Sequence, residues 1–171
     1  MASAMTMQIL TSCPNLRIFT GSVLKAQDIL GITDGGESAT EQDSSPIQPQ
    51  EWVCRDIRSF RVFICGFLDR PAHWQRLVMQ RLATLDKIES LCVGSDYAIS
   101  SYPEKDRDGL DLRLAAGMYV LSSLKKLNYL SFSPLEMNMD EEDVRWMAVA
   151  WPNLTDVHGG LNHDSKKAET L

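Results

Sequence analysis

The sequence predicts a mixed α/β fold, a leucine-rich-repeat solenoid of about five irregular repeats with short parallel strands on the concave face and helices on the convex face. The first observation behind this prediction is an apolar triplet with two residues between its members, which is how a leucine-rich repeat opens. It occurs at Cys13, Leu16 and Phe19; Cys54, Ile57 and Phe60; Leu85, Ile88 and Leu91; Leu124, Leu127 and Leu130; Trp151, Leu154 and Val157. A further apolar residue or glycine follows two positions later, at Gly21, Val62, Val93, Phe132 and Gly159.

The second observation is the position of Cys65 and Asn162. Each stands three residues after the last apolar position of its copy, where the repeat template has Asn or Cys. The third observation is an order of helix then strand that recurs along the chain and predicts parallel strands joined by crossovers. One strand and one helix bury too little apolar surface to fold alone, so neighbouring repeats are expected to cover one another.

Helices are expected between the triplets. A weak helical pattern runs from Ser22 to Leu30, and three stronger ones follow. Asp69 and Pro71 open the first of these, Asp108 opens the second, and the acidic run 140–143 opens the third, where negative side chains favour a helix N-terminus. Their apolar stripes are Trp74, Leu77, Val78, Leu82 and Leu85; Leu110, Leu114, Met118 and Leu121; and Val144, Met147, Ala148 and Trp151.

The repeats are longer and less regular than usual. The steps between the middle members of the triplets are 41, 31, 39 and 27 residues, whereas a standard repeat has roughly 20 to 29. An acidic loop rich in Gly, Ser and Pro at about 33–50 and a segment at 95–108 are therefore expected to loop out. The predicted organisation is one solenoid over 1–164, with this acidic loop inserted, followed by a flexible C-terminal tail at 165–171. The loop is either an inert insertion or a contact segment regulated by phosphorylation.

Composition excludes several classes of function. The net charge is −6 and no basic stripe is visible, which argues against a nucleic-acid partner. No apolar stretch approaches the roughly 18 to 20 residues of a membrane span, and the N-terminus lacks the features of a secretory signal. We therefore expect no membrane association and a cytoplasmic or nuclear location. The four cysteines, Cys13, Cys54, Cys65 and Cys92, fall on repeat or strand positions and are interpreted as small buried residues rather than disulfides.

Several segments resemble a known family. "CPNLRIFTG", "RLATLDKIESLCVGSDY", "LSSLKKLNYLSF", "MDEEDVRWM" and "WPNLTDVHGGLNHD" are similar to the repeat region of fungal F-box and leucine-rich-repeat proteins with the ribonuclease-inhibitor-like fold. The resemblance covers about 9–164. It implies that the repeats hold a protein substrate, while an N-terminal F-box would bind the Skp adaptor of a cullin-based ubiquitin ligase.

The chain departs from that family pattern at its N-terminus. No Leu- and Pro-rich F-box precedes the first repeat, and apolar residues such as Met5 and Ile9 lead directly into the first triplet. Solenoids usually carry polar caps. We therefore expect the chain to be a C-terminal piece of a longer array or a shortened gene model, and contact with the Skp adaptor to require the missing N-terminal F-box.

A protein-binding surface is expected on the concave side. Side chains alternate along a strand, so the residues on either side of each third triplet member should point away from the core. These are Ile18, Ser59, Ser90, Tyr129 and Asp156 before it, and Thr20, Arg61, Cys92, Ser131 and His158 after it. Aromatic residues and Arg are enriched at energetic anchor points of interfaces. The predicted binding residues are Arg61, Phe63, Tyr129, Ser131, Asp156 and His158; the alternative is that they are ordinary solvated strand residues.

Catalysis is not expected. His158 and His163, with Asp156 and Asp164 nearby, have the residue types of a metal site, but two glycines intervene and the helical spacing is missing. Cys92 has no sequence-linked His to activate it. No metal and no cofactor are therefore predicted. The predicted function is a protein-binding repeat module, the substrate-recognition part of an F-box-type ubiquitin-ligase subunit; the alternatives are a stand-alone leucine-rich-repeat scaffold or inhibitor and a small metal-dependent hydrolase.

Overall fold

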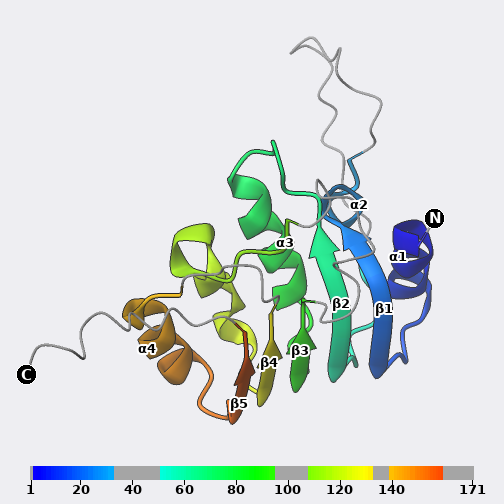
Figure 1. Ribbon diagram of the computed structural model, residues 1–171. Helices are drawn as coiled ribbons and strands as arrows, with labels where there is room; N and C mark the ends of the chain where they lie inside the picture. The colour runs from blue at the N-terminus through cyan, green and yellow to red at the C-terminus, as the bar shows by residue number, and fades with distance from the viewer. Residues whose placement is uncertain (1, 33–50, 95–107, 133–138, 160–171) are drawn as a thin grey trace, which may run out of the picture.

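The chain forms a mixed α/β structure around a parallel sheet (Figure 1). The computed structural model describes residues 2–32, 51–94, 108–132 and 139–159. Within them the strands lie in sequence order and every neighbouring pair is parallel. The strands are β1 (Ile18–Lys25), β2 (Ser59–Cys65), β3 (Ser90–Cys92), β4 (Tyr129–Ser131) and β5 (Asp156–His158). The acidic loop predicted at 33–50 and the tail predicted at 165–171 lie outside the described residues.

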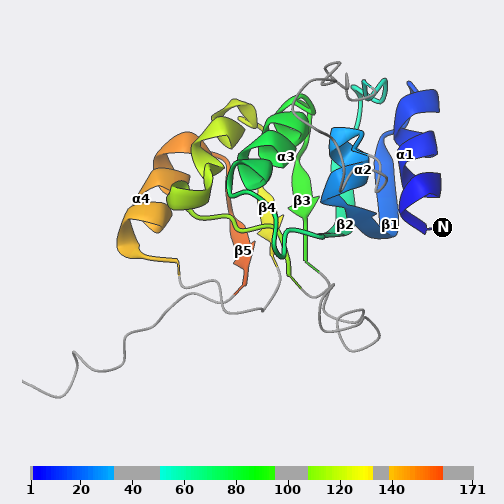
Figure 2. The same ribbon diagram turned by 90° about the horizontal axis from the view of Figure 1, so that it is seen from above.

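Helices lie along one face of this sheet, and the strands follow a gentle curve beneath them (Figure 2). The α-helices are α1 (Ala2–Ser12), α2 (Ala26–Leu30), α3 (His73–Ala83) and α4 (Glu141–Ala150). The described residues between α3 and α4 include the 3₁₀ helices η3 (Leu114–Ala116) and η4 (Met118–Ser123). The predicted order of helix then strand and the predicted parallel sheet are confirmed.

The apolar triplets form the core between the sheet and the helices. Their third members are direct neighbours across the sheet: Phe19, Phe60, Leu91, Leu130 and Val157. All but Val157 are buried, and the middle members Ile57, Ile88 and Leu127 are completely so. The first triplet fits less well, because Cys13 is exposed and Leu16 is only half-buried. The prediction that Cys13 occupies a core position is wrong.

Helix α1 was not expected from the sequence. It packs against β1 at one end of the sheet and buries Met7 and Leu10. The backbone N–H of Lys25 donates to the Ser3 hydroxyl at 2.9 Å, and the N–H of Val53 donates to the carbonyl of Leu10 at 3.0 Å. These two hydrogen bonds join the first turn of α1 to the end of β1 and the last turn of α1 to the segment that precedes β2.

The helix expected at 22–30 is shorter than predicted. Strand β1 continues through Lys25, after a register shift between Thr20 and Val23, and α2 covers only the last five residues before Gly31. Val23 and Leu24 lie opposite Phe63 and Ile64 of β2 and are buried. Pairing with a long neighbouring strand therefore outweighs the weak helical pattern, as tertiary context often does.

The helix expected to begin at Asp108 is absent. The Asp108 carboxylate instead accepts the backbone N–H groups of Gly66, Phe67 and Leu68, just beyond the end of β2. Its predicted stripe is still buried at Leu110, Met118 and Leu121. The segment turns by way of η3 and η4, which Gly117 separates at φ 109, a left-handed conformation that interrupts an α-helix.

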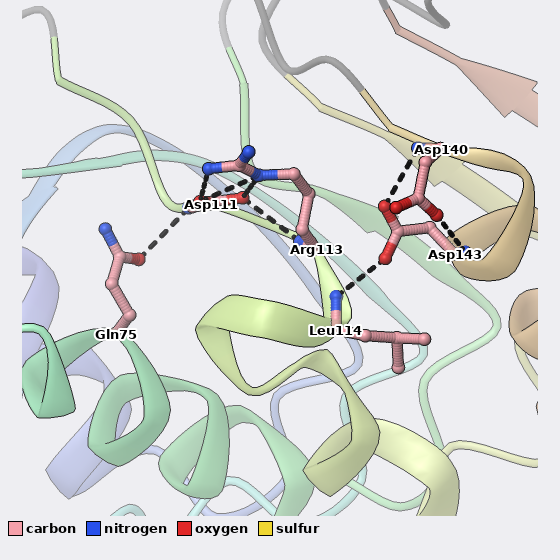
Figure 3. A network of polar contacts seen from close by, with 6 residues as sticks. All are labelled: Gln75, Asp111, Arg113, Leu114, Asp140 and Asp143. Atoms are coloured by element: carbon pink, nitrogen blue, oxygen red, sulfur yellow. Dashed lines mark hydrogen bonds and ion pairs between the residues drawn. The ribbon is translucent and has the colours of Figure 1, made fainter.

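Helix α4 begins as predicted, with an acidic first turn. Asp140 caps it by accepting the N–H groups of Glu142 and Asp143, while the Asp143 carboxylate accepts the N–H of Asp140 at 3.0 Å. This reciprocal arrangement is a capping box. The same buried Asp143 carboxylate accepts the N–H of Leu114 at 2.8 Å, which joins α4 to the start of η3 (Figure 3).

A second set of polar contacts joins this region to α3. The side-chain oxygen of Gln75 accepts the N–H of Asp111 at 3.0 Å, and the Asp111 carboxylate binds the Arg113 guanidinium at 2.6 Å (Figure 3). These hydrogen bonds hold the irregular segment between α3 and α4. Specific polar side chains therefore replace regular helix hydrogen bonds in this part of the layer.

Candidate protein-binding surface

The sheet face opposite the helices carries two aligned rows of side chains, which we call the open face. One row is Ile18, Ser59, Ser90, Tyr129 and Asp156; the other is Thr20, Arg61, Cys92, Ser131 and His158. The two rows flank the buried third members of the triplets. Since side chains alternate along a strand, they lie on the side away from the main core.

Exposure varies strongly along the open face. Arg61, Asp156 and His158 are exposed, Tyr129 is half-buried, and Ser131 is only 6% exposed. Ser131 therefore contributes little side-chain surface, although the sequence places it in the same row as Arg61 and His158. Ile18, at the start of β1, is 70% exposed.

Three predicted residues come together at the β5 end of the open face. The rings of Tyr129 and His158 lie with centroids 5.3 Å apart and planes tilted by 32°. Asp156 is the register neighbour of Tyr129, and its carboxylate accepts the Thr155 hydroxyl at 2.8 Å. We call Tyr129, Asp156 and His158 the terminal patch; it combines an aromatic ring, a carboxylate and an imidazole within one accessible area.

Arg61 is not part of the terminal patch. It belongs to β2, three strand positions from His158 in the same row. Strands in a sheet are about 4.8 Å apart, so this step is about 14 Å. A partner would have to span β2 to β5 to touch both Arg61 and His158.

Phe63 is not exposed on the open face. It is 1% exposed and forms a small cluster with Val23 and Cys65, separate from the main core. Beyond the triplet, β2 remains paired with β1, and Cys65 also forms an antiparallel bridge with Gly109. The Phe63 ring therefore offers no surface to a partner.

Sequence reasoning missed a hollow on the helix side. It has a volume of about 410 Å³ and is lined chiefly by Leu30, Ile32, Trp74, Leu77 and Arg81. Burial lowers the pKa of the Arg81 guanidinium. The apolar stripe of α3 predicts that Leu77 lies in the core. In the structure Leu77 instead lines this hollow and is 36% exposed.

Cys92, weighed above as a nucleophile, is buried in β3. The buried Cys92 thiol donates to the carbonyl of Gly94 at 3.3 Å. No group of three or more His, Cys, Asp or Glu side chains among the described residues is arranged to hold a metal ion. His163 and Asp164, named above as possible ligands, lie outside those residues.

Comparison with known proteins adds no relative. No family model, no curated protein and no solved structure matches the chain. None of the helices in the described ranges is both long enough and apolar enough to cross a membrane.

Proposed function

We propose that the chain is a leucine-rich-repeat solenoid that binds another protein on its open face, and that it is the substrate-recognition part of an F-box-type, cullin-based ubiquitin-ligase subunit. The observation that carries the binding proposal is the alignment of the five strands in sequence order. Each strand adds one residue to each of the two rows, so a single continuous wall of side chains results.

The repeat pattern supports the solenoid. Residues at equivalent triplet positions, such as Ile57, Ile88 and Leu127, are completely buried although 31 to 39 residues separate them in the sequence. Stacked repeats that cover one another's apolar faces have this property. The number of residues between triplets varies, and the helical segments there vary too: α3 is a regular α-helix, whereas η3 and η4 are short 3₁₀ helices.

The chemistry of the open face supports a protein ligand. The terminal patch offers a ring, an acceptor and an imidazole, and Arg61 offers a guanidinium on the same face. Tyr and Arg are among the residues that contribute most to binding energy at protein interfaces. The extended face of a repeat protein is its usual binding surface.

Quantitative affinity capture tests the binding proposal. We would compare the wild-type chain with Arg61→Ala and Tyr129→Ala in extracts of its own organism. Tyr119→Ala is the matched control, because Tyr119 lies in η4 on the helix side and is 47% exposed. We expect a defined protein to be lost with Arg61→Ala or Tyr129→Ala and retained with Tyr119→Ala. Identical captured proteins for all four chains would contradict binding by the open face.

The ligase step needs a separate measurement. A protein captured through the open face should accumulate when the gene is deleted, because its ubiquitination would be lost. Its half-life in a translation-block experiment would then rise. An unchanged half-life would instead favour a stand-alone scaffold or inhibitor that binds the same protein.

A further inference from the structure

The two ends of the sheet differ. At the first strand, α1 packs against β1 (Figure 1). At the other end, β5 pairs with β4, and all three of its residues are exposed. Among the described residues nothing else pairs with β5. Uncovered edge strands present unpaired backbone groups to another strand, and natural proteins protect them with short length, charged side chains, Pro or a bulge. Strand β5 is short and carries the acidic Asp156 but has no Lys or Pro, so a new neighbour must be able to receive that carboxylate.

The backbone of β5 shows which groups face the open edge. The N–H of Asp156 donates to the carbonyl of Asn128, and the carbonyl of His158 accepts the N–H of Phe132. The polar groups of Asp156 and His158 are thus directed at β4. Because backbone groups alternate along a strand, the N–H and the carbonyl of Val157 are directed at the open edge. Val157 can therefore exchange two hydrogen bonds with a new neighbour.

We propose that β5 pairs antiparallel with β5 of a second copy of this chain, around a two-fold axis at Val157. Val157 of each copy would exchange both backbone hydrogen bonds with Val157 of the other. Such an interface uses the same surface on both subunits and closes after two copies.

Complementarity between a hydrogen-bond donor and an acceptor is the reason to choose a second copy. In an antiparallel pair centred on Val157, Asp156 of one chain lies opposite His158 of the other, and the same contact occurs again across the axis. Both side chains are exposed, and neither forms an ion pair within the described residues. An imidazole N–H can donate a hydrogen bond to a carboxylate directly across an antiparallel pair, whereas two carboxylates in those positions repel each other. The order Asp, Val, His is therefore complementary to itself.

Helix α4 supplies apolar surface at the same end of the molecule. It directly precedes β5 in the chain and lies at that end of the helix layer (Figure 2). Val149 is 82% exposed and Val144 is 42% exposed. A three-residue strand alone buries far less than the roughly 1,000 Å² that a specific interface needs. Contact between the two α4 helices would supply the remainder, and we expect a reversible dimer in the micromolar range.

Sedimentation equilibrium of the purified full-length chain over a range of concentrations tests the proposal. We expect a monomer–dimer equilibrium for the wild type. Asp156→His places two histidines opposite each other and His158→Asp places two aspartates opposite each other. Each variant loses both Asp–His contacts of the dimer, so each should weaken the dimer by about tenfold. The double variant Asp156→His with His158→Asp restores complementarity and should dimerise like the wild type. Val149→Glu should also weaken the dimer.

Mixing the two single variants is the sharpest arm of the test. In a heterodimer of the Asp156→His chain with the His158→Asp chain, every His lies opposite an Asp. The mixture should therefore dimerise even though each variant alone does so poorly. A wild-type chain that stays monomeric up to hundreds of micromolar would overturn the proposal. So would a dimer whose stability is the same in the single variants, the double variant and the mixture, because its interface would then lie elsewhere.

Discussion

Replacing Leu127 with Ala should remove a large part of the stability of this chain. Leu127 is the middle member of the fourth triplet and is 0% exposed, packed in the same core as Ile88 and Leu124. Truncating a buried Leu loses the transfer free energy of its methyl groups and leaves a cavity, which together cost about 2–5 kcal/mol. A typical domain has about 5–15 kcal/mol of unfolding free energy in total. The substitution should therefore remove about a third of the stability.

Urea denaturation followed by far-UV circular dichroism measures this effect. With a slope of about 1–3 kcal/mol per molar urea, a loss of about 3 kcal/mol moves the midpoint down by roughly 1 to 3 M. Leu68→Ala is the matched control, since Leu68 is 54% exposed. It makes the same chemical change and should alter the unfolding free energy by about 0.5 kcal/mol or less.

The comparison of the two Leu variants decides whether the triplets form the core. Equal, small effects of Leu127→Ala and Leu68→Ala would refute the reasoning, because they would mean that Leu127 is not buried between the sheet and the helices. A change in the urea slope rather than the midpoint would also count against it. Such a change reports altered compactness of one state, not a simple loss of packing.

Three further predictions concern polar and ionisable groups. Asp143→Ala should cost about 1–3 kcal/mol of unfolding free energy, because its buried carboxylate accepts two backbone N–H groups that would be left unpaired; urea denaturation measures this, and no change would contradict it. The Lys87 ammonium, hydrogen-bonded to the Asp56 carboxylate at 2.5 Å, lowers the pKa of that carboxyl from its ordinary value. NMR titration should show a higher pKa for Asp56 in Lys87→Met than in the wild type. In the wild type the Lys87–Asp56 pair stabilises the folded state above the unfolded-state pKa of Asp56, and this contribution is lost as the pH falls through the lower folded-state pKa. Burial raises the pKa of the Cys54 thiol, whereas Cys13 is exposed, so iodoacetamide at neutral pH should alkylate Cys13 first; equal rates by mass spectrometry would contradict the burial of Cys54.

Much of the sheet could be predicted from the sequence because its signal is local and repeated. Each triplet places three apolar side chains at a fixed spacing, and the third of them lies in a strand in every copy. Helix α4 was equally predictable, since Asp140 and the acidic residues after it are a local start signal that needs no tertiary contact. Agreement is therefore best where one short segment determines its own structure.

The failures occur where a distant segment decides. Asp108 is a residue type that often caps a helix, but its carboxylate instead accepts hydrogen bonds from three backbone N–H groups about forty residues earlier in the chain. Val23 and Leu24 carry a weak helical pattern and become strand because β2 extends far enough to pair with them. Neither partner can be identified from the spacing of the residues around Asp108 or Val23.

The candidate site depends on both kinds of information, which is why only part of it could be predicted. Alternation along one strand correctly places Tyr129, Asp156 and His158 on the face away from the main core, and the register between β4 and β5 then brings them together. The same alternation assigns Phe63 to that face, yet its ring is 1% exposed and packs in a cluster with Val23 and Cys65. Alternation therefore predicts the side of a sheet on which a residue lies, whereas strand length and neighbouring segments decide whether that side is accessible. Strand length does not decide it alone, because Cys92 and Ser131 are buried although β3 and β4 are as short as β5, whose three residues are all exposed.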